Sequence, residues 1–459
     1  MADSRLVWCG ESPRDHPREH VGGKGHNLLK LYNLAQDTGL FYVPEFFVVP
    51  TGFKYTFRSD ETGLSAIFPT NELEKTFAPM RKPVIVRSSS PLEDGLNASF
   101  AGVFLSLPDN HNYDALCRSI ARVDHSAFAD HAEKYTERMG LQPSDSMAMI
   151  VQEQVTDFLE RGVIQLERDG AIIEGMTKKG NSFTHEIDYW TLREMIKEDA
   201  VWTFEKEDKE RDYIGEGEMW YAVHGAKRAA DLLGLEGTVQ VEFLLAPARL
   251  PDFVQIRQLP KINSHCAHLD LDIPKGVPYL ESQVCNGVPG DISLPAYVTF
   301  SESAFGRILI ETGFKSGDER MQLLKNSKLL PSEEFHNAWN FREIMRFAGV
   351  GEGLHYFEEM WARGNSLFPE YILVCDKLDE SICGMNNLTT GKRGIITCLE
   401  ANKTSHAMTV ARDLGIPAMG VNGNIADPNY FFHQVESGDV IRMKSDGKRA
   451  VAYVEKSRE

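Results

Sequence analysis

The sequence predicts a mixed α/β protein built from more than one domain. Its 459 residues exceed the usual size of a single domain and favour about two to four. Short apolar strand patterns recur along the chain and alternate with segments of helical spacing. A composition of 42% hydrophobic and 25% charged residues is that of an ordinary globular protein.

Charge and cysteine usage limit the classes of partner. The chain has 49 basic and 67 acidic residues, a net charge of −18, which predicts no broad basic face for nucleic acid. No apolar run approaches the roughly 18 residues of a membrane span, and the first residues lack the apolar core of a signal peptide. Seven cysteines without a CxxC pair favour reduced thiols. We therefore expect a cytoplasmic protein with no membrane partner.

The first 110 residues predict a glycine-rich turn, a helix and several strands. Lys24 stands among three glycines, and leucines at helical spacing follow over residues 28–34. Apolar strand patterns cover residues 47–49, 84–86 and 99–107. Arg87 and three serines directly follow the second of these strands.

Two cations of this region are candidate phosphate ligands. The glycines around Lys24 would let backbone N–H groups approach a phosphate while the lysine supplies charge, although the Walker A spacing is absent. The Arg87 guanidinium could bind two phosphate oxygens at once through parallel N–H groups. The alternatives are an ordinary loop for Lys24 and a surface ion pair for Arg87.

Strand patterns over residues 147–155, 238–246 and 252–260 carry further polar side chains. Period two places Gln240 and Glu242 on one face of their strand, and Gln255 and Arg257 on one face of the next. Glu242 and Gln255 offer the oxygen ligands that Mg²⁺ prefers. The pattern suits a metal and phosphate site between two strands, with a solvated sheet edge as the alternative.

The second half of the chain predicts strands around a helical segment. Residues 284–300 read as a turn and a strand, residues 301–365 as helical, and residues 371–377 and 394–400 as strands. Residues 437–455 read as a hairpin with Asp446 and Gly447 at its turn.

His406 stands at the start of a predicted helix over residues 407–414. Thr404 or Ser405 can cap this helix, and Gly415 ends it. At a helix N-terminus the free N–H groups favour an incoming phosphoryl anion and keep the imidazole neutral and nucleophilic. The alternative is a structural histidine, which is the more common role of a single histidine.

Several blocks resemble the phosphoenolpyruvate synthase, pyruvate phosphate dikinase and rifampicin phosphotransferase family. GGKGHNLLKL, VIVRSSSPLEDGLNASFAGVFLSL, MAMIVQEQV and VEFLL with VQIRQ resemble its ATP-grasp nucleotide-binding domain, and TSHAMTVARDLGIPAMG resembles its swivelling phosphohistidine domain. The resemblance implies an ATP-grasp domain over residues 1–260 and a linker over 261–280. A phosphohistidine domain over 281–300 and 366–459 would follow, with residues 301–365 as a helical insertion.

The resemblance also implies roles for single residues. Lys24, Arg87 and Arg257 would contact the ATP phosphates, and Glu242 and Gln255 would hold Mg²⁺. His406 would accept a phosphoryl or pyrophosphoryl group while ATP becomes AMP. Further nucleotide contacts would come from Gly102, Ser106 and Gln152.

The expected function is that of an ATP-dependent phosphotransferase of the dikinase type. No segment resembling the family's phosphoenolpyruvate/pyruvate barrel is found, so the expected acceptor is a different small molecule, such as an amino-acid or amide nitrogen or a hydroxyl. Gln240 replaces the first carboxylate of the family's Asp-x-Glu. Two alternatives stay open: an ATP-grasp ligase acting through an acyl phosphate, and a partner-dependent phosphocarrier. A homodimer is also left open.

Overall fold

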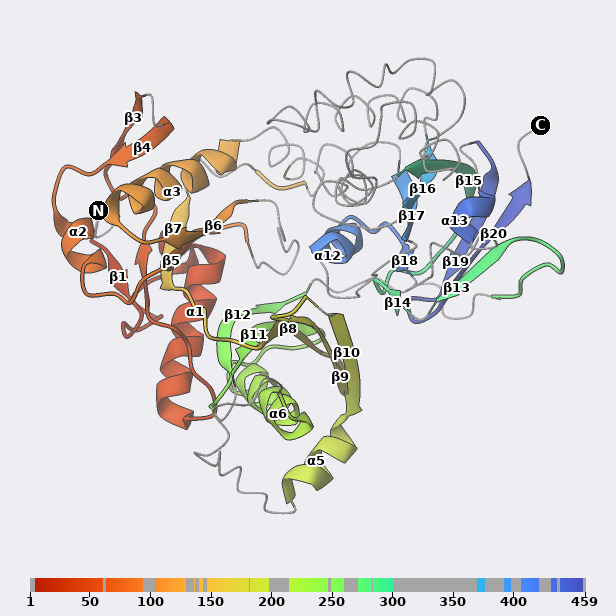
Figure 1. Cartoon of the computed structure of the whole chain (residues 1–459), viewed down its shortest axis with the longest axis horizontal. Helices are drawn as coiled ribbons and strands as arrows, with labels where there is room; N and C mark the ends of the chain where they lie inside the picture. Colours follow the sequence, from red (N-terminus) through yellow and green to blue (C-terminus); the bar gives the residue numbers. More distant parts are fainter. Residues whose placement is uncertain are drawn as a thin grey trace. The chain divides into compact units, whose positions relative to one another are not determined.

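The chain forms two compact units, Met1–Lys261 and Ile262–Glu459. Each combines β-sheet with α-helix in the computed structural model (Figure 1), which confirms the mixed α/β class. The predicted helical insertion over residues 301–365 and the first ten residues of the predicted linker lie outside the described residues. The structure describes residues 5–60, 63–93, 104–128, 136, 140–142, 147–180, 182–197, 214–246, 249–259, 271–282, 284–299, 370–375, 392–397, 406–420, 431–435 and 438–456.

The first sheet of the N-terminal unit has the strand order β1-β2-β7-β5-β6. Neighbouring strands pair antiparallel, and the strands predicted at 47–49, 84–86 and 147–155 are confirmed. Phe46 and Val48 pack toward α1, whereas Phe47 and Val49 pack toward α3, so a helix covers each face. The elements are β1 (Val7–Trp8), α1 (Arg18–Thr38), β2 (Phe46–Val49), β5 (Val84–Ser89), β6 (Ser106–Asn110), α3 (Tyr113–His125) and β7 (Ala148–Glu153).

One sequence prediction in this region is tested only in part, and another needs correction. Residues 99–103 of the strand predicted over 99–107 lie outside the described residues, and Ser106 and Leu107 begin β6, which runs to Asn110 and contains Pro108. An edge strand tolerates a proline, because its outer side needs no N–H donor. The glycine-rich segment around Lys24 is not a separate turn but part of α1, which has a non-helical kink at Gly22.

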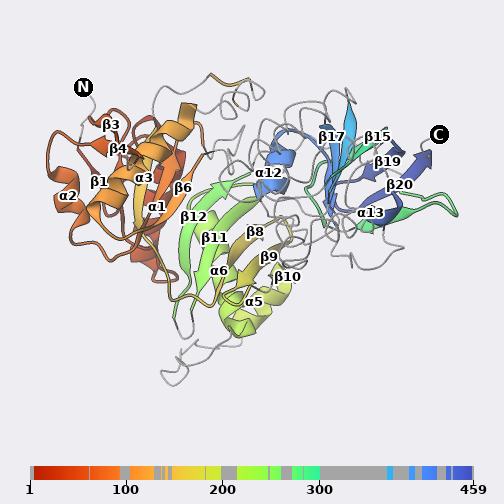
Figure 2. The same ribbon diagram turned by 45° about the horizontal axis from the view of Figure 1, so that its top comes forward.

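The second sheet of the N-terminal unit has the order β10-β9-β8-β11-β12. Helix α6 covers one face with Met219, Ala222 and Ala226, which pack on apolar residues of the strands (Figure 2). The other face is polar. The elements are β8 (Glu160–Leu166), β9 (Gly170–Thr177), β10 (Ser182–Asp188), α5 (Tyr189–Lys197), α6 (Glu216–Leu232), β11 (Val239–Leu245) and β12 (Asp252–Gln258). A hairpin of β3 (Thr56–Asp60) and β4 (Gly63–Ile67), α2 (Glu72–Phe77) and the 3₁₀ turn η1 (Ser126–Phe128) complete the unit as described.

The C-terminal unit is built on an eight-stranded sheet of order β13-β20-β19-β15-β16-β17-β18-β14. Only residue 283 separates β13 from β14, so the two end strands of this order are successive parts of one segment. Strands β15 to β18 pair parallel, and β19 and β20 form the predicted hairpin, with Gly447 at φ 90°. The elements are β13 (Tyr279–Ser282), β14 (Val284–Cys285), β15 (Gly290–Thr299), β16 (Tyr371–Cys375), β17 (Lys392–Thr397), α12 (His406–Asp413), β18 (Ala418–Gly420), α13 (Phe431–Gln434), β19 (Val440–Ser445) and β20 (Ala450–Lys456).

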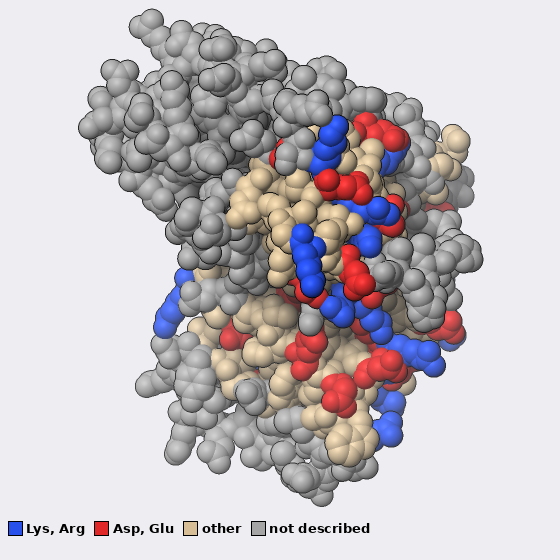
Figure 3. Space-filling model, turned by 90° about the vertical axis from the view of Figure 1, so that its right-hand side faces the viewer, with Lys and Arg blue, Asp and Glu red and all other residues tan. Residues whose placement is uncertain are grey.

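Charges of both signs are interspersed on the face of the molecule shown in Figure 3. In the C-terminal unit Arg442 binds Asp291 at 2.9 Å and Glu455 at 3.2 Å, and Arg449 pairs with Glu281. These cross-strand pairs neutralise one another, so they add little net field. Within the part of the chain that the structure describes, no helix is both long enough and apolar enough to cross a membrane.

Candidate functional site

Arg87 joins the two sheets of the N-terminal unit. It lies near the end of β5 in the first sheet, and its guanidinium reaches β11 and β12 of the second sheet. Nη2 donates to Gln255 Oε1 at 2.5 Å and to Glu242 Oε2 at 3.1 Å, and Nη1 donates to the Val254 carbonyl at 2.6 Å. The residue is 8% exposed. Arg87 is therefore a buried cross-link, not the surface ion pair that the sequence left as its alternative.

Gln152 lies beside this guanidinium. Its Oε1 accepts from Arg87 Nη1 at 3.4 Å, and its Nε2 donates to the Pro44 carbonyl at 3.4 Å. The side chain is fully buried. The structure thus brings together Gln152, Glu242 and Gln255, which come from three different strands, around one cation.

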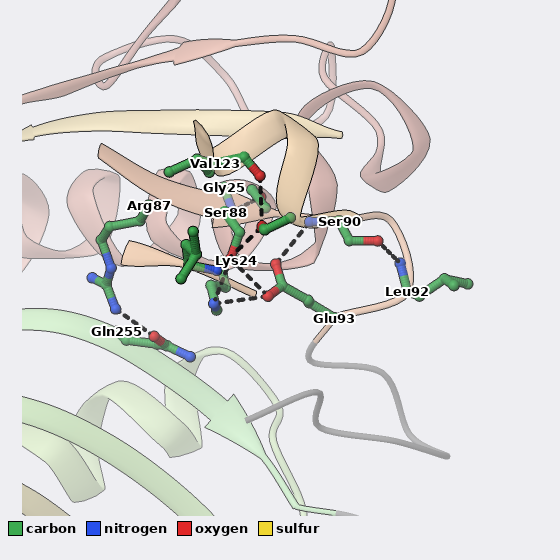
Figure 4. Close-up of polar contacts among 12 residues, drawn as sticks. Lys24, Gly25, Arg87, Ser88, Ser90, Leu92, Glu93, Val123 and Gln255 are labelled. Carbon is green, nitrogen blue, oxygen red and sulfur yellow. Dashed lines mark hydrogen bonds and ion pairs between the residues drawn. The ribbon is translucent and has the colours of Figure 1, made fainter. Parts of the chain in front are cut away.

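Lys24 forms a second buried cluster with Glu93. The Lys24 Nζ lies 2.8 Å from Glu93 Oε1 and 3.2 Å from Ser88 Oγ. Glu93 is fully buried; its Oε1 also accepts from Ser88 Oγ at 3.0 Å, and its Oε2 accepts from the Ser90 N–H at 2.7 Å. Figure 4 shows this cluster apart from the Arg87–Gln255 pair. The Lys24 charge is accordingly neutralised inside the protein.

The glycines next to Lys24 allow α1 to approach the segment after β5. A Cβ atom at Gly22 would lie 1.7 Å from the Ser89 carbonyl oxygen, and one at Gly23 would lie 1.8 Å from the Glu93 carbonyl oxygen. The Gly23 N–H donates to the Ser90 carbonyl at 2.9 Å. Because only glycine fits such a backbone contact, these glycines fix the position of Lys24 relative to Glu93.

Arg257 lies on the polar face of the second sheet and contacts Gln240. Its Nε and Nη2 both donate to Gln240 Oε1, at 3.1 and 2.6 Å. The Gln240 Nε2 donates to Gln165 Oε1 at 2.9 Å. The strand register places Gln240 opposite Arg257 on one side and opposite Gln165 on the other, while Glu242 lies opposite Gln255. The predicted sharing of strand faces is confirmed.

Three site residues from the sequence remain less defined. Ser106 is exposed and lies opposite Arg87 in the strand register, and no contact of its side chain with the Arg87 cluster is found in the described residues. Gly102 lies outside the described residues. His406 is the first residue of α12, as the helix pattern predicted, but its side chain is not among those described, nor are the predicted caps Thr404 and Ser405.

Two residues of the site were missed from the sequence. Glu93 follows the three serines by three positions, a distance that allows its carboxylate to fold back onto the Ser90 N–H. Gln165 belongs to β8, where it shares a strand face with Arg161 and Val163. Residues 160–166 do not alternate strictly between polar and apolar, so no local pattern indicated Gln165, and the ion pair between Glu93 and Lys24 likewise depends on tertiary contact.

The oxygen donors of the site fit a hard divalent cation. Glu242 supplies a carboxylate whose side chain is 26% exposed, and Gln255 supplies an amide oxygen on the facing strand. Both oxygens already converge on one positively charged nitrogen of Arg87, so this point favours positive charge. Within the described residues no group of three or more His, Cys, Asp or Glu side chains is arranged for a metal.

Comparison with known families supports a nucleotide-binding role for part of this unit. Residues 66–164 match the family described as pyruvate phosphate dikinase, AMP/ATP-binding domain. The matched range includes Arg87, Glu93 and Gln152 but not Lys24 or the strands β11 and β12. This part of the chain is thus similar to an ATP-binding domain. No curated protein matches the sequence.

Solved structures give a weaker comparison. D-alanine–D-alanine ligase from Helicobacter pylori has a TM-score of 0.28 and 10% identity over 51% of this chain and 53% of its own. N5-carboxyaminoimidazole synthase from Aspergillus clavatus has a TM-score of 0.26 and 11% identity over 66% of this chain and 61% of its own. The similarity therefore spans about half to three fifths of these proteins, and scores this low leave the reaction open.

Proposed function

We propose that this chain is an ATP-dependent phosphotransferase of the dikinase type, with His406 as the residue that carries the transferred group. The observation that carries the proposal is the convergence of Arg87, Glu242 and Gln255, next to Arg257 on the same sheet face, in a unit matched to an ATP-binding domain. A cationic fork, a carboxylate and an amide oxygen are the groups that phosphoryl transfer requires, since catalysis there is mostly positioning and charge stabilisation.

The residues of the N-terminal unit have distinct tasks in this proposal. Arg257 and Arg87 bind phosphate oxygens, and Glu242 with Gln255 holds Mg²⁺, which would neutralise charge on the phosphates. Gln152 keeps the Arg87 guanidinium in place through its Oε1. In the structure described, Lys24 is paired with Glu93. To contact a phosphate as well, the Lys24 ammonium group would have to bind both the Glu93 carboxylate and the phosphate.

His406 supplies the nucleophile in the proposal. A ring nitrogen forms a bond to the β-phosphorus while the bond from that phosphorus to the α–β bridging oxygen breaks, and AMP leaves with that oxygen. The position of His406 at the first residue of α12 supports this role, because the free N–H groups of a first helical turn favour a bound anion. Water or phosphate then takes the γ-phosphoryl group from the pyrophosphoryl-histidine. The β-phosphoryl group left on His406 passes to a small-molecule acceptor, whose nitrogen or hydroxyl attacks the phosphorus as its bond to the ring nitrogen breaks.

Labelled ATP tests the proposal directly. Protein incubated with Mg²⁺ and ATP labelled at the β- or γ-phosphorus should retain acid-labile β-label and release AMP. His406→Ala should lose the label, whereas His111→Ala, a change at an exposed histidine of the N-terminal unit, should keep it. Release of ADP without label on the protein would indicate the ligase alternative. Folded, nucleotide-bound protein that acquires no label would indicate the partner-dependent phosphocarrier and overturn the proposal.

A further inference from the structure

Arg257 is a buried cation whose protein partner is a neutral amide. The residue is 3% exposed, and within the described part of the chain its hydrogen bonds go to Gln240 Oε1 alone. The two other candidate phosphate ligands differ from it in this respect. Arg87 is paired with the Glu242 carboxylate at 3.1 Å, and Lys24 is paired with the Glu93 carboxylate at 2.8 Å.

A buried guanidinium without a carboxylate partner is unfavourable for the protein alone. A guanidinium is a permanent charge in proteins, so the cost of its burial has to be offset by its partners. Removing a charge from water is unfavourable unless a counter-charge or good hydrogen bonds compensate it. The Gln240 oxygen satisfies two N–H groups but supplies no formal charge. This arrangement is expected where an anionic ligand supplies the missing charge.

The orientation of the Gln240 amide is fixed by its neighbour. Its oxygen faces Arg257 because its Nε2 donates to Gln165 Oε1, and Gln165 in turn donates from its Nε2 to Glu167 Oε1 at 2.9 Å. The amide nitrogen of Gln240 and that of Gln165 therefore each donate to a side-chain oxygen. If the Gln240 amide were flipped, it would point an N–H group at the Arg257 guanidinium. Gln240 and Gln165 are 2% and 5% exposed, so water does not replace these bonds easily.

We infer that Gln240 and Gln165 are positioning residues that orient Arg257 toward an anionic ligand without neutralising its charge. The ligand class is a polyphosphate, and its identification as that of a nucleotide depends on the proposed function. A glutamate at position 240 would hold the Arg257 guanidinium in nearly the same place, but its carboxylate would neutralise the positive charge. A glutamine at this position therefore favours anion binding more than the carboxylate of almost the same shape.

The test separates charge from position in the absence of metal. Calorimetry in EDTA measures the Kd of ATP, inorganic tripolyphosphate and adenosine for the wild-type chain and its variants. Gln240→Glu should weaken ATP and tripolyphosphate by about tenfold or more, which corresponds to about 1.4 kcal/mol, and leave adenosine unchanged. Gln36→Glu adds the same charge at an exposed position of α1. It should change none of the three Kd values by more than about twofold.

Two further variants keep the inference testable if Gln240→Glu folds poorly. Gln165→Leu removes the bond that orients Gln240 without changing any charge, and it should weaken tripolyphosphate by about threefold to tenfold. In the background of Arg257→Gln, Gln165→Leu should have no further effect on tripolyphosphate, because the cation that Gln165 and Gln240 orient is gone. Thermal unfolding of each variant establishes that the fold is kept.

The outcomes separate this inference from the proposed function. Wild-type binding of ATP with unchanged affinity in Gln240→Glu and Gln165→Leu overturns the inference and leaves the proposed function standing. Binding of tripolyphosphate with the expected losses, but no binding of ATP, supports the anion site and overturns the proposed function. Wild-type protein that binds neither ATP nor tripolyphosphate overturns both.

Discussion

Arg87 and Gln255 are joined by a hydrogen bond of 2.5 Å that connects the first and second sheets of the N-terminal unit. The same Arg87 nitrogen also binds Glu242, so the two side chains that the sequence predicts as metal ligands hold a protein cation in this structure. The site is consequently part of what holds the N-terminal unit together. A change at Arg87 should affect stability as well as ligand binding.

Replacing Arg87 by alanine should destabilise the protein by about 2–3 kcal/mol, because hydrogen bonds to a charged group are lost and buried acceptors stay unpaired. Arg87→Lys should recover less than half of this loss, since a lysine ammonium lacks the planar, rigid set of donors with which the guanidinium reaches its acceptors. Urea unfolding measures both changes. Arg14→Ala, at an exposed arginine, is the control and should stay within about 0.5 kcal/mol. An equally small effect for Arg87→Ala would contradict the cross-link.

Lys24 and Glu93 should show strong energetic coupling. Glu93→Gln keeps only one of the two oxygens that accept from Ser88 and Ser90 and removes the charge that pairs with Lys24, and it should cost about 3 kcal/mol. In a double-mutant cycle with Lys24→Met, the coupling free energy should exceed about 1 kcal/mol. The exposed pair of Lys227 and Asp231 in α6 is the matched control and should give about 0.5 kcal/mol or less. Equal coupling in the two cycles would show that burial adds nothing at Lys24.

Gly23→Ala should disrupt the contact between α1 and the segment after β5. The new Cβ atom would overlap the Glu93 backbone, and backbone on both sides must move to relieve it. We expect a loss of about 3 kcal/mol or more, or failure to fold. Gly10→Ala is the control, because no atom lies within 4 Å of its Cβ position and its φ is not positive. Circular dichroism melts compare the two variants. A Gly23→Ala protein as stable as the control would argue against the close approach.

The sequence predicted best where one local pattern determines the structure. Period two in β11 and β12 placed Gln240 with Glu242 and Gln255 with Arg257, because strand geometry alone decides which side chains share a face. The same reasoning located the hairpin of β19 and β20, since Asp446 and Gly447 are typical turn residues. It did not anticipate β8, β9 and β10, where Gln165 and Glu174 are buried but Arg161, Thr184 and Glu186 are exposed.

Contacts between distant segments could not be predicted from local patterns. The sequence offers Lys24 as a candidate phosphate ligand or an ordinary loop residue, because nothing in the neighbouring sequence indicates Glu93, which is 69 positions away. Arg87 and Gln255 are farther apart still, and their contact depends on the packing of two sheets. Whether Lys24, Gly102, Ser106 and His406 act on a nucleotide stays a prediction from resemblance.

Glu160 makes the stability of the N-terminal unit depend on pH. This glutamate begins β8, and its Oε2 is buried without a hydrogen-bond partner. Burial, followed by repulsion from Glu218 in the first turn of α6, raises the pKa of Glu160 from 4.5 to about 7. Between these values the folded protein keeps a proton that the unfolded chain has released. The stabilising contribution is therefore complete below about pH 4.5 and is lost as pH rises through about 7.

Glu160→Gln should remove this dependence, because glutamine is neutral at every pH. At pH 8 the variant should be more stable than the wild type by about 1–2 kcal/mol, a value reduced for the partial exposure of the side chain, and at pH 4.5 the two should agree within about 0.5 kcal/mol. Urea unfolding from pH 4.5 to 8 measures the difference. Glu236→Gln, at an exposed glutamate, should give a difference that hardly changes with pH. A wild-type protein that gains stability relative to Glu160→Gln as pH rises would reverse the sign and refute the assignment, because an ionised Glu160 would then be favoured by folding.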